Sequence, residues 1–352
     1  MSQLRYAQEE LLREHEGLAP HVVAGYRLHG GFDSKGRYRS PRAPGRWAAV
    51  RAWQGALAQR GFPLLVADRN LLRAGPYPSY AQQKLLLRHD LGQTLWNSLT
   101  ITGVIEARGG LLCQVTAPEF QSIVVEDVSE TAVGHLNLGL LRAHGLDEGG
   151  DAARGVGGHD AMWFAVRDLL FAPRRWPDPA IPASIARPDE DHALLPLLPR
   201  AHERMILLLM NVLLIEVRAE NIFAFVEALV KDPELFTESR GDAATALDLI
   251  GRIREDERIH VDYLRTVLSE LRSFSYRAKG GALASGAELL DPLWRSLVEW
   301  HTVENPRLAR TQQRAILEER ILEHPEGAAI LEKFRALESG DPAAPAKLDP
   351  PP

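Results

Sequence analysis

Glu257 and His260 lie three residues apart in a segment whose pattern predicts a long helix over residues 242–273. At about 100° per residue, both side chains fall within the apolar stripe that also contains Ile253 and Leu264. Burying a carboxylate there is costly unless it is paired or bound to a metal ion. Because a carboxylate and an imidazole at this spacing can reach one point, the pair predicts a metal site in a helical core.

A second predicted helix, over residues 200–231, is apolar on nearly all sides, which is typical of a central helix. Its acids Glu216 and Glu220 share a face with Leu209 and Leu213. We predict Glu220 as the metal ligand from this helix and Glu216 as the alternative.

Two helices predicted earlier in the chain supply one carboxylate each. The first, over residues 79–108, carries Glu106 on an apolar face. The second, over residues 118–144, carries Glu130 on such a face, with Glu126 one turn earlier. Four predicted helices therefore each offer an acid to one interior.

The only histidine close to Glu130 is out of phase with it. Val133 occupies the position three residues later, and His135 follows at five residues, about 140° away from the face. A π-bulge, which is frequent at functional sites, would bring His135 round. Without one, the site has a single histidine or uses another, such as His159.

The connections predict how the helices are arranged. Two helix pairs with short links are joined by a long crossover over residues 146–199, which contains a short helix at 159–171. This connectivity is typical of ferritin-like bundles. Residues 1–78 are expected to form an N-terminal arm packed on the core, with a hairpin near Asp33 to Gly36 and a helix at 47–60. The four-helix bundle is expected over 79–273 and further C-terminal helices over 274–338. The composition of residues 339–352 predicts a disordered tail.

The order Glu106, Glu130, Glu220 and Glu257-x-x-His260 resembles the ferritin-like di-iron carboxylate proteins. The resemblance implies an all-α, ferritin-like four-helix bundle with two bound iron ions, manganese or a mixed pair being the alternatives. The implied metal ligands are Glu106, Glu130, His135, Glu220, Glu257 and His260, with Glu126, Glu216 and His159 in reserve, and Glu130 and Glu257 would bridge the metals and act in catalysis.

The resemblance also implies an O2-dependent oxidoreductase acting on a small organic substrate by hydroxylation, N-oxygenation, desaturation or oxidative cleavage. Such chemistry can require an electron donor as a further partner. Two other functions are open: a metal-dependent enzyme that does not use O2, such as a dimanganese or single-metal hydrolase or isomerase, and a metal-free helical binding scaffold. In the scaffold, the buried acids would pair with arginines such as Arg88 and Arg218.

Composition excludes several other classes of protein. Of 352 residues, 41 are Lys or Arg and 47 are Asp or Glu, so no nucleic-acid partner is expected. The lone Cys113 excludes an intramolecular disulfide and a thiolate metal cluster. The most apolar run, 206–215, is too short to span a membrane, and the first residues lack an apolar signal region. We therefore expect a cytoplasmic protein without a membrane partner, and a homodimer is open because the 200–231 helix is so apolar.

Overall fold

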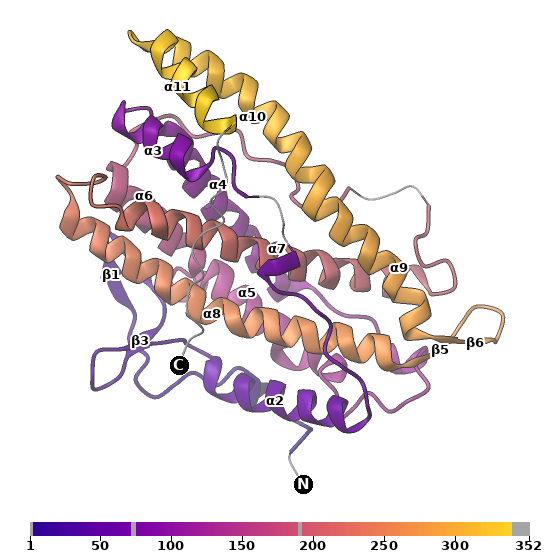
Figure 1. The fold of residues 1–352 in the computed structure, drawn as a ribbon. Helices are drawn as coiled ribbons and strands as arrows, with labels where there is room; N and C mark the ends of the chain where they lie inside the picture. The colour runs from indigo at the N-terminus through magenta and orange to yellow at the C-terminus, as the bar shows by residue number, and fades with distance from the viewer. Residues whose placement is uncertain (1–2, 72–74, 189–191, 340–352) are drawn as a thin grey trace.

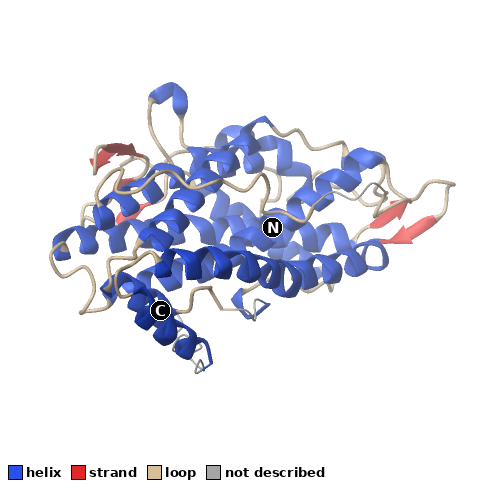
Figure 2. Cartoon of the chain, turned by 90° about the horizontal axis from the view of Figure 1, so that it is seen from above, coloured by secondary structure: helices blue, strands red, loops and turns tan. Residues whose placement is uncertain are grey.

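The computed structural model describes residues 3–71, 75–188 and 192–339, and most of these residues are helical. Strands in these ranges form only two-stranded antiparallel hairpins, which lie toward the ends of the molecule (Figure 2). This confirms the all-α class. The predicted disordered tail lies outside the described residues, except for Ser339, the last residue of α11 (Gly327–Ser339).

The centre of the molecule is a set of packed helices (Figure 1). The long helix α8 (Arg240–Ser273) packs against α7 (Arg200–Lys231) on one side and α6 (His159–Phe171) on the other. Helix α6 packs in turn on α4 (Gln93–Gly109), and α5 (Leu141–Gly149) contacts both α4 and α6. No helix in the described part of the chain is long and apolar enough to cross a membrane.

The helices predicted at 159–171 and 200–231 are confirmed as α6 and α7, and α8 begins only two residues before its predicted start. The helix predicted over 79–108 is instead two helices, α3 (Tyr80–Arg88) and α4. The helical conformation is interrupted between them, where Asp90 adopts a positive φ of 55°.

The helix predicted over 118–144 is wrong. Its residues form single tight turns at Phe120–Ser122 and Val133–His135 and a π-helical stretch at Leu136–Leu140 before α5 begins. Within the first half, the Gln121 side chain donates to the carbonyls of Val124 and Glu126 and accepts from the amide of Val128. These hydrogen bonds replace helical ones, because a side-chain amide can satisfy backbone groups in a compact loop.

The region predicted as a crossover, 146–199, contains the end of α5 and all of α6. Because α6 packs between α4 and α8, it is part of the bundle rather than a connection outside it. The bundle is therefore built from α4, α6, α7 and α8 with α5 inserted, which differs from the predicted connectivity.

The N-terminal arm wraps one face of the bundle. Helix α2 packs on α8, and the predicted hairpin at Asp33 is confirmed, with the Asp33 side chain accepting from the amides of Lys35 and Arg37. The arm consists of α1 (Gln8–Leu11), β1 (His21–Val23), β2 (Tyr26–Leu28), β3 (Gly31–Phe32), β4 (Tyr38–Arg39), α2 (Ala43–Gln59) and a single tight turn at Arg69–Leu71.

The C-terminal helices cover another face. Helix α9 packs on α7 and α8, and α11 packs on α3 (Figure 1). This part consists of β5 (Ser275–Arg277), β6 (Leu283–Ser285), α9 (Gly286–Glu299), a π-helical stretch at Trp300–Glu304, α10 (Asn305–Leu322) and α11.

Two apolar cores occupy opposite ends of the bundle. On α8, Ile253 and the apolar residues before it belong to one core, and Tyr263 and those after it belong to the other. On α7, the same division falls between Val217 and Phe223. The buried polar residues of the candidate site lie in the layer between the two cores.

Candidate metal centre

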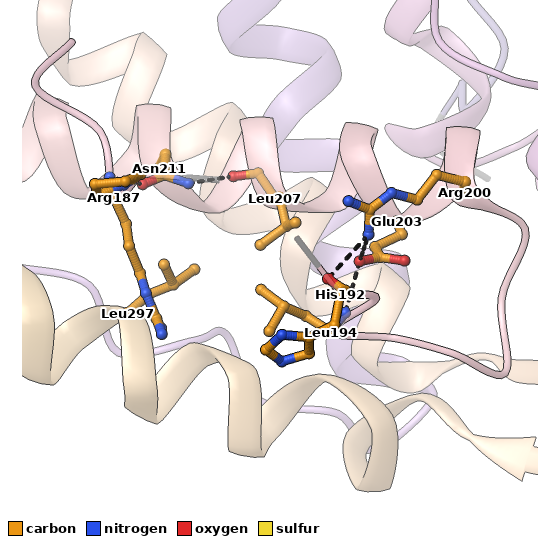
Figure 3. Close-up of a pocket in the computed structure, with 9 residues that line it drawn as sticks. Arg187, His192, Leu194, Arg200, Glu203, Leu207, Asn211 and Leu297 are labelled. Atoms are coloured by element: carbon orange, nitrogen blue, oxygen red, sulfur yellow. Dashed lines mark hydrogen bonds and ion pairs between the residues drawn. The ribbon is translucent and has the colours of Figure 1, made fainter. Parts of the chain in front are cut away.

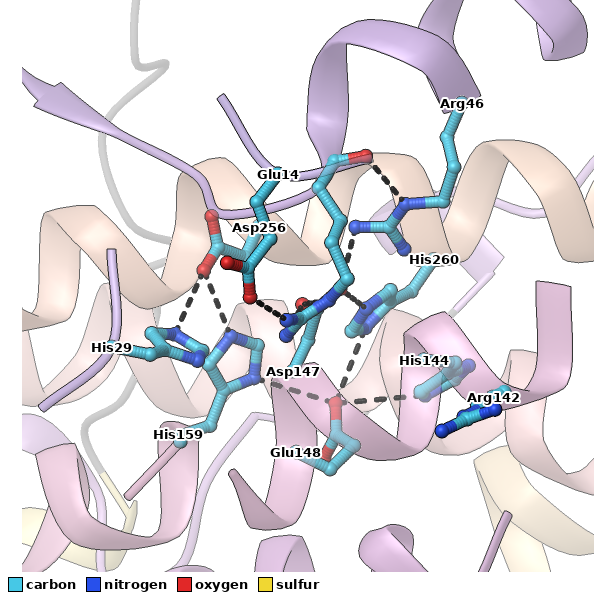
Figure 4. A network of polar contacts seen from close by, with 12 residues as sticks. Glu14, His29, Arg46, Arg142, His144, Asp147, Glu148, His159, Asp256 and His260 are labelled. Atoms are coloured by element: carbon cyan, nitrogen blue, oxygen red, sulfur yellow. Dashed lines mark hydrogen bonds and ion pairs between the residues drawn. The ribbon is translucent and has the colours of Figure 1, made fainter. Parts of the chain in front are cut away.

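Three histidines converge on one carboxylate oxygen, Oε1 of Glu148 (Figure 4). His144 and Glu148 lie one turn apart on α5, His159 is the first residue of α6, and His260 belongs to α8. The nearest ring nitrogens lie 3.5 Å (His144 Nε2), 3.3 Å (His159 Nδ1) and 3.2 Å (His260 Nδ1) from this oxygen. All four side chains are buried.

Three further glutamates complete the cluster. Glu257 of α8 places Oε1 3.0 Å from His159 Nδ1 and Oε2 2.9 Å from His260 Nδ1. Glu216 of α7 places Oε1 3.0 Å from His144 Nε2. Glu106 of α4 is also buried. Burial, and then the nearby charges of Glu148 and Glu257, raise the pKa of Glu106 well above its usual range.

Six of these residues form two overlapping sets, and within each set the donor atoms lie within 4.8 Å of one another; Glu106 belongs to neither set. One set is His144, Glu148, Glu216 and His260, and the other is Glu148, His159, Glu257 and His260. Each set could hold a metal ion, since carboxylate and imidazole donors suit iron or manganese. Glu148 and His260 belong to both sets. Glu148 has two oxygens and is placed to bridge two ions, whereas the inner nitrogen of His260 can ligate only one of them.

The far nitrogen of each histidine has its own partner. The pairs are His260 Nε2 with Asp147 Oδ2 at 3.2 Å, His159 Nε2 with Asp256 Oδ2 at 3.3 Å, and His144 Nδ1 with the Tyr263 hydroxyl at 2.7 Å. Metal-binding histidines are commonly oriented in this way by an outer hydrogen bond. The arrangement leaves the inner nitrogen of each ring directed at the cluster.

Asp147, which holds His260, is itself held by two buried arginines of the N-terminal arm. Arg42 Nη2 lies 2.6 Å from Asp147 Oδ1, and Arg46 Nη2 lies 2.5 Å from Oδ2. Burial opposes ionisation of Asp147, but Arg46 and Arg42 hold its pKa well below the usual range. In the described ranges, the four glutamates of the cluster have no such arginine or lysine partner.

The pKa values reflect this concentration of acids. Burial and the charge of Glu257 raise the pKa of Glu216 to about 8. Burial also opposes the charged forms of His144 and Glu257. Even so, Tyr263, Glu148 and Glu216 raise the pKa of His144 to about 10, and His159 and His260 lower that of Glu257 to about 2. Without a cation, the cluster therefore has to hold protons that bound metal ions would replace.

Among the described residues, three atoms at the centre of the cluster make ion-pair contacts but no hydrogen bond of good geometry: His159 Nδ1, Glu148 Oε1 and Glu257 Oε1. Buried polar atoms left unpaired are rare and costly. Coordination would satisfy all three at once, so the residues present fit a bound metal.

Gly109, at the end of α4, lets the helix approach this cluster. A Cβ at this position would lie 2.8 Å from Cγ of Glu148 and 2.9 Å from its Oε2. The absence of a side chain there is what allows α4 to pack closely on α5.

The structure brings together five of the residues singled out from the sequence: Glu106, Glu257 and His260, and from the reserve Glu216 and His159. It does not bring Glu220 to them. Glu220 pairs with Arg254, and its side chain is 31% exposed. Glu216 and Glu220 share a face, but only Glu216 meets a histidine.

Glu130 and Glu126 were also placed wrongly, because the helix expected to carry them does not form. Glu130 is 54% exposed and lies 3.4 Å from Arg5. Glu126 accepts from the amide of Ser275 at 2.9 Å and takes no part in the cluster. The bridging position expected for Glu130 corresponds to Glu148.

His135 is buried but satisfied elsewhere. Its Nε2 accepts from the amide of Tyr6 at 2.9 Å, so its Nδ1 donates to the carbonyl of Thr131 at 2.7 Å. The ring packs on Trp53. A π-helical stretch does follow, at residues 136–140, but it does not turn His135 into the cluster.

The sequence did not predict His144, Asp147 and Glu148 as ligands, because the helix predicted over 118–144 ends at the first of them. The available signal was their spacing, since residues i, i+3 and i+4 share one face of a helix. His29 and Asp256, which lie beside the cluster, were missed as well.

A separate hollow lies between α7 and α9 (Figure 3). Arg200 and Glu203 at one end are 2.5 Å apart, and Asn211 at the other accepts from the amide of Arg187 at 3.2 Å. None of the cluster residues lines this hollow.

The chain matches no protein-family model, and searches of curated proteins and of solved structures also find no match.

Proposed function

We propose that this chain is an O2-dependent oxidoreductase that uses a dinuclear metal centre, most simply di-iron, to oxidise a small organic substrate. The observation that carries the proposal is the pair of overlapping donor sets joined by Glu148. Two iron ions bound there would supply the reduction of O2 and the oxidising power for the substrate.

The charges support two ions rather than one. Glu106, Glu148, Glu216 and Glu257 carry four negative charges when ionised, and neutral imidazoles do not offset them. Two divalent ions carry four positive charges. The neighbouring charges cancel one another, since Arg42 and Arg46, which pair with Asp147, carry two positive charges and Asp147 and Asp256 carry two negative ones.

The architecture also supports the proposal. Dinuclear carboxylate centres are commonly built inside helix bundles from glutamates and histidines on facing helices. Here the four glutamates come from α4, α5, α7 and α8, and α8 carries the Glu-x-x-His spacing. We retain ferritin-like ancestry as part of the proposal, with the ligand-bearing α5 and α6 as departures from it.

A metal-free scaffold is less well supported, because the two arginines expected to neutralise its buried acids form no ion pair with the cluster in the described part of the chain. Arg88 pairs with Glu234 at 2.6 Å. In the described parts of the chain, no acid pairs with Arg218, and burial lowers its pKa. The buried acids meet histidines instead.

The chain's own residues have clear tasks in this proposal. Glu106, Glu148, Glu216, Glu257 and the three inner ring nitrogens would hold the ions. Asp147, Asp256 and Tyr263 orient the rings. The two apolar cores on either side exclude water, so an oxidant formed between them is protected from side reactions.

The test is to load the protein with ferrous iron anaerobically and then admit O2, following O2 consumption and the absorption spectrum. We expect rapid O2 uptake that depends on bound iron, with a new absorption band in the near-ultraviolet or visible range. Loaded protein that does not consume O2, or that turns over a substrate anaerobically, would exclude the oxygenase and leave a hydrolase or isomerase.

A further inference from the structure

A third group of potential metal ligands lies next to the dinuclear cluster. His29 follows β2, and its Nε2 is 3.3 Å from Asp256 Oδ2. His159 Nε2 approaches the same oxygen at 3.3 Å from the other side (Figure 4). Donor atoms of His29, His159 and Asp256 all lie within 4.8 Å of one another.

The outer members of this group are not satisfied by the protein. His29 is 5% exposed, yet neither of its ring nitrogens has a hydrogen-bond partner of good geometry. Asp256 is fully buried, and its Oδ1 also has none, although the Tyr38 hydroxyl donates to Oδ2 at 3.0 Å. The hydrogen bond to His159 gives Asp256 a role in orienting that ring. It does not account for a buried histidine at position 29.

His29 also lies where the cluster comes nearest to a hollow on the N-terminal arm. Glu14, Arg42, Leu146 and Asp151 line this hollow together with His29. The lining has two arginines, Arg42 and Arg154, and two acids, Glu14 and Asp151, and Arg154 lies 2.9 Å from Glu14. An approaching cation therefore does not meet unbalanced positive charge.

We propose that His29, Asp256 and His159 Nε2 form an entry site through which divalent metal ions reach the dinuclear centre. Two imidazoles and one carboxylate with open positions suit iron, manganese or cobalt. The ion keeps its charge throughout, and besides coordination the only bonds that change are the two N–H bonds of His159. This inference rests on the proposed dinuclear centre.

His159 makes the site an entry position rather than a third resting site. A neutral imidazole offers a lone pair on only one nitrogen at a time. When Nε2 binds an incoming ion, Nδ1 carries the proton. When Nδ1 serves the dinuclear centre, Nε2 donates to Asp256. As the ion moves inward, Nδ1 loses its proton to water and Nε2 takes one up from water, so the ring changes from one role to the other.

The experiment measures the rate of cobalt(II) uptake by the full-length apoprotein under anaerobic conditions, by stopped-flow absorption. We expect His29→Gln to slow uptake about tenfold or more while the final content stays at two ions per chain. His15→Gln, in the same arm but outside the three ligand groups, is the control and should load at the wild-type rate. His29→Asp supplies an anionic carboxylate ligand in place of the imidazole and should load faster than His29→Gln, which a merely structural role for His29 would not produce.

The outcomes separate the two proposals. If wild type binds two ions and His29→Gln loads equally fast, the entry site is refuted and the dinuclear centre stands. If wild type binds no cobalt or iron, both fail. If His29→Gln does not fold, His29→Ala carries the same comparison, and uptake at the wild-type rate by His29→Ala would overturn the entry site.

Discussion

Helices α7 and α8 hold acids at two successive levels, and the acids differ in what they meet. At one level, Glu216 and Glu257 face histidines and pair with no arginine in the described part of the chain. One turn further along α7, Glu220 meets Arg254, which also lies 2.7 Å from Glu227. The second level is neutralised by the chain itself. The first is not, and it can become neutral only by taking up protons or metal ions.

The largest expected effect is on stability when metal is removed. Ligands that bind only the folded state stabilise it by about 4 kcal/mol per site when free ligand is 1,000 times Kd. We expect chelated protein to unfold at clearly lower urea concentration than protein loaded with manganese or ferrous iron. Identical unfolding curves for the two forms would contradict metal binding at the level of Glu216 and Glu257.

A matched pair of substitutions tests the levels directly. Glu257→Gln removes a ligand and should lower metal content by at least one ion per chain. Glu220→Gln should leave metal content unchanged and cost at most about 1 kcal/mol, because its partly exposed ion pair is screened by solvent. Metal analysis and urea unfolding of both variants provide the measurement, and equal metal loss in the two would contradict the assignment.

Glu270, further along α8, is a buried acid that lies outside the metal-ligand groups and forms no ion pair with a described residue, although Arg60 is near enough to lower its pKa slightly. It accepts from the amide of Val133 at 3.0 Å, and burial raises its pKa from 4.5 to about 8. The folded protein thus keeps a proton that the unfolded chain releases above pH 4.5. The resulting stability is fully present below that pH and is lost as pH rises to 8, by about 1.4 kcal/mol per unit at most.

Glu270→Gln removes this dependence. Relative to wild type, the chelated variant should gain a few kcal/mol in free energy of unfolding between pH 5 and pH 8. Urea unfolding at both pH values measures it. A constant difference between variant and wild type would show that Glu270 is ionised in the folded protein.

A smaller effect is expected from Gly109→Ala. The added methyl would press on the Glu148 side chain, at a cost of roughly 1–3 kcal/mol, and should weaken metal binding. Gly251→Ala on α8 meets nothing within 4 Å and is the control, with unchanged or slightly higher stability. Thermal melting with and without metal distinguishes the two, and tight metal binding by Gly109→Ala would count against a ligand role for Glu148.

The parts of the fold that sequence predicts well are those whose determinants are local. Helices α6 and α7 have continuous helical patterns bounded by Gly or Pro, and α8 has a continuous pattern on which Glu257 and His260 share one face. The segment before α5 could not be predicted in this way. Its shape depends on side-chain contacts such as those of Gln121, which an apolar pattern does not reveal.

The choice between Glu216 and Glu220 shows the same limit. The two acids are one turn apart on the same face, so periodicity cannot separate them. Arg254 on the neighbouring helix decides, because it pairs with Glu220 and leaves Glu216 to His144. Partner residues from another helix are set by packing, which a single helical pattern does not contain.

The most direct test of the dinuclear centre is the metal content of the full-length protein after anaerobic reconstitution with ferrous iron and removal of loosely bound ions. The overlapping donor sets around Glu148 predict two iron ions per chain, with fewer in Glu148→Gln. Wild-type protein that retains no iron or manganese would contradict the account, and retention of a single ion would contradict a dinuclear centre.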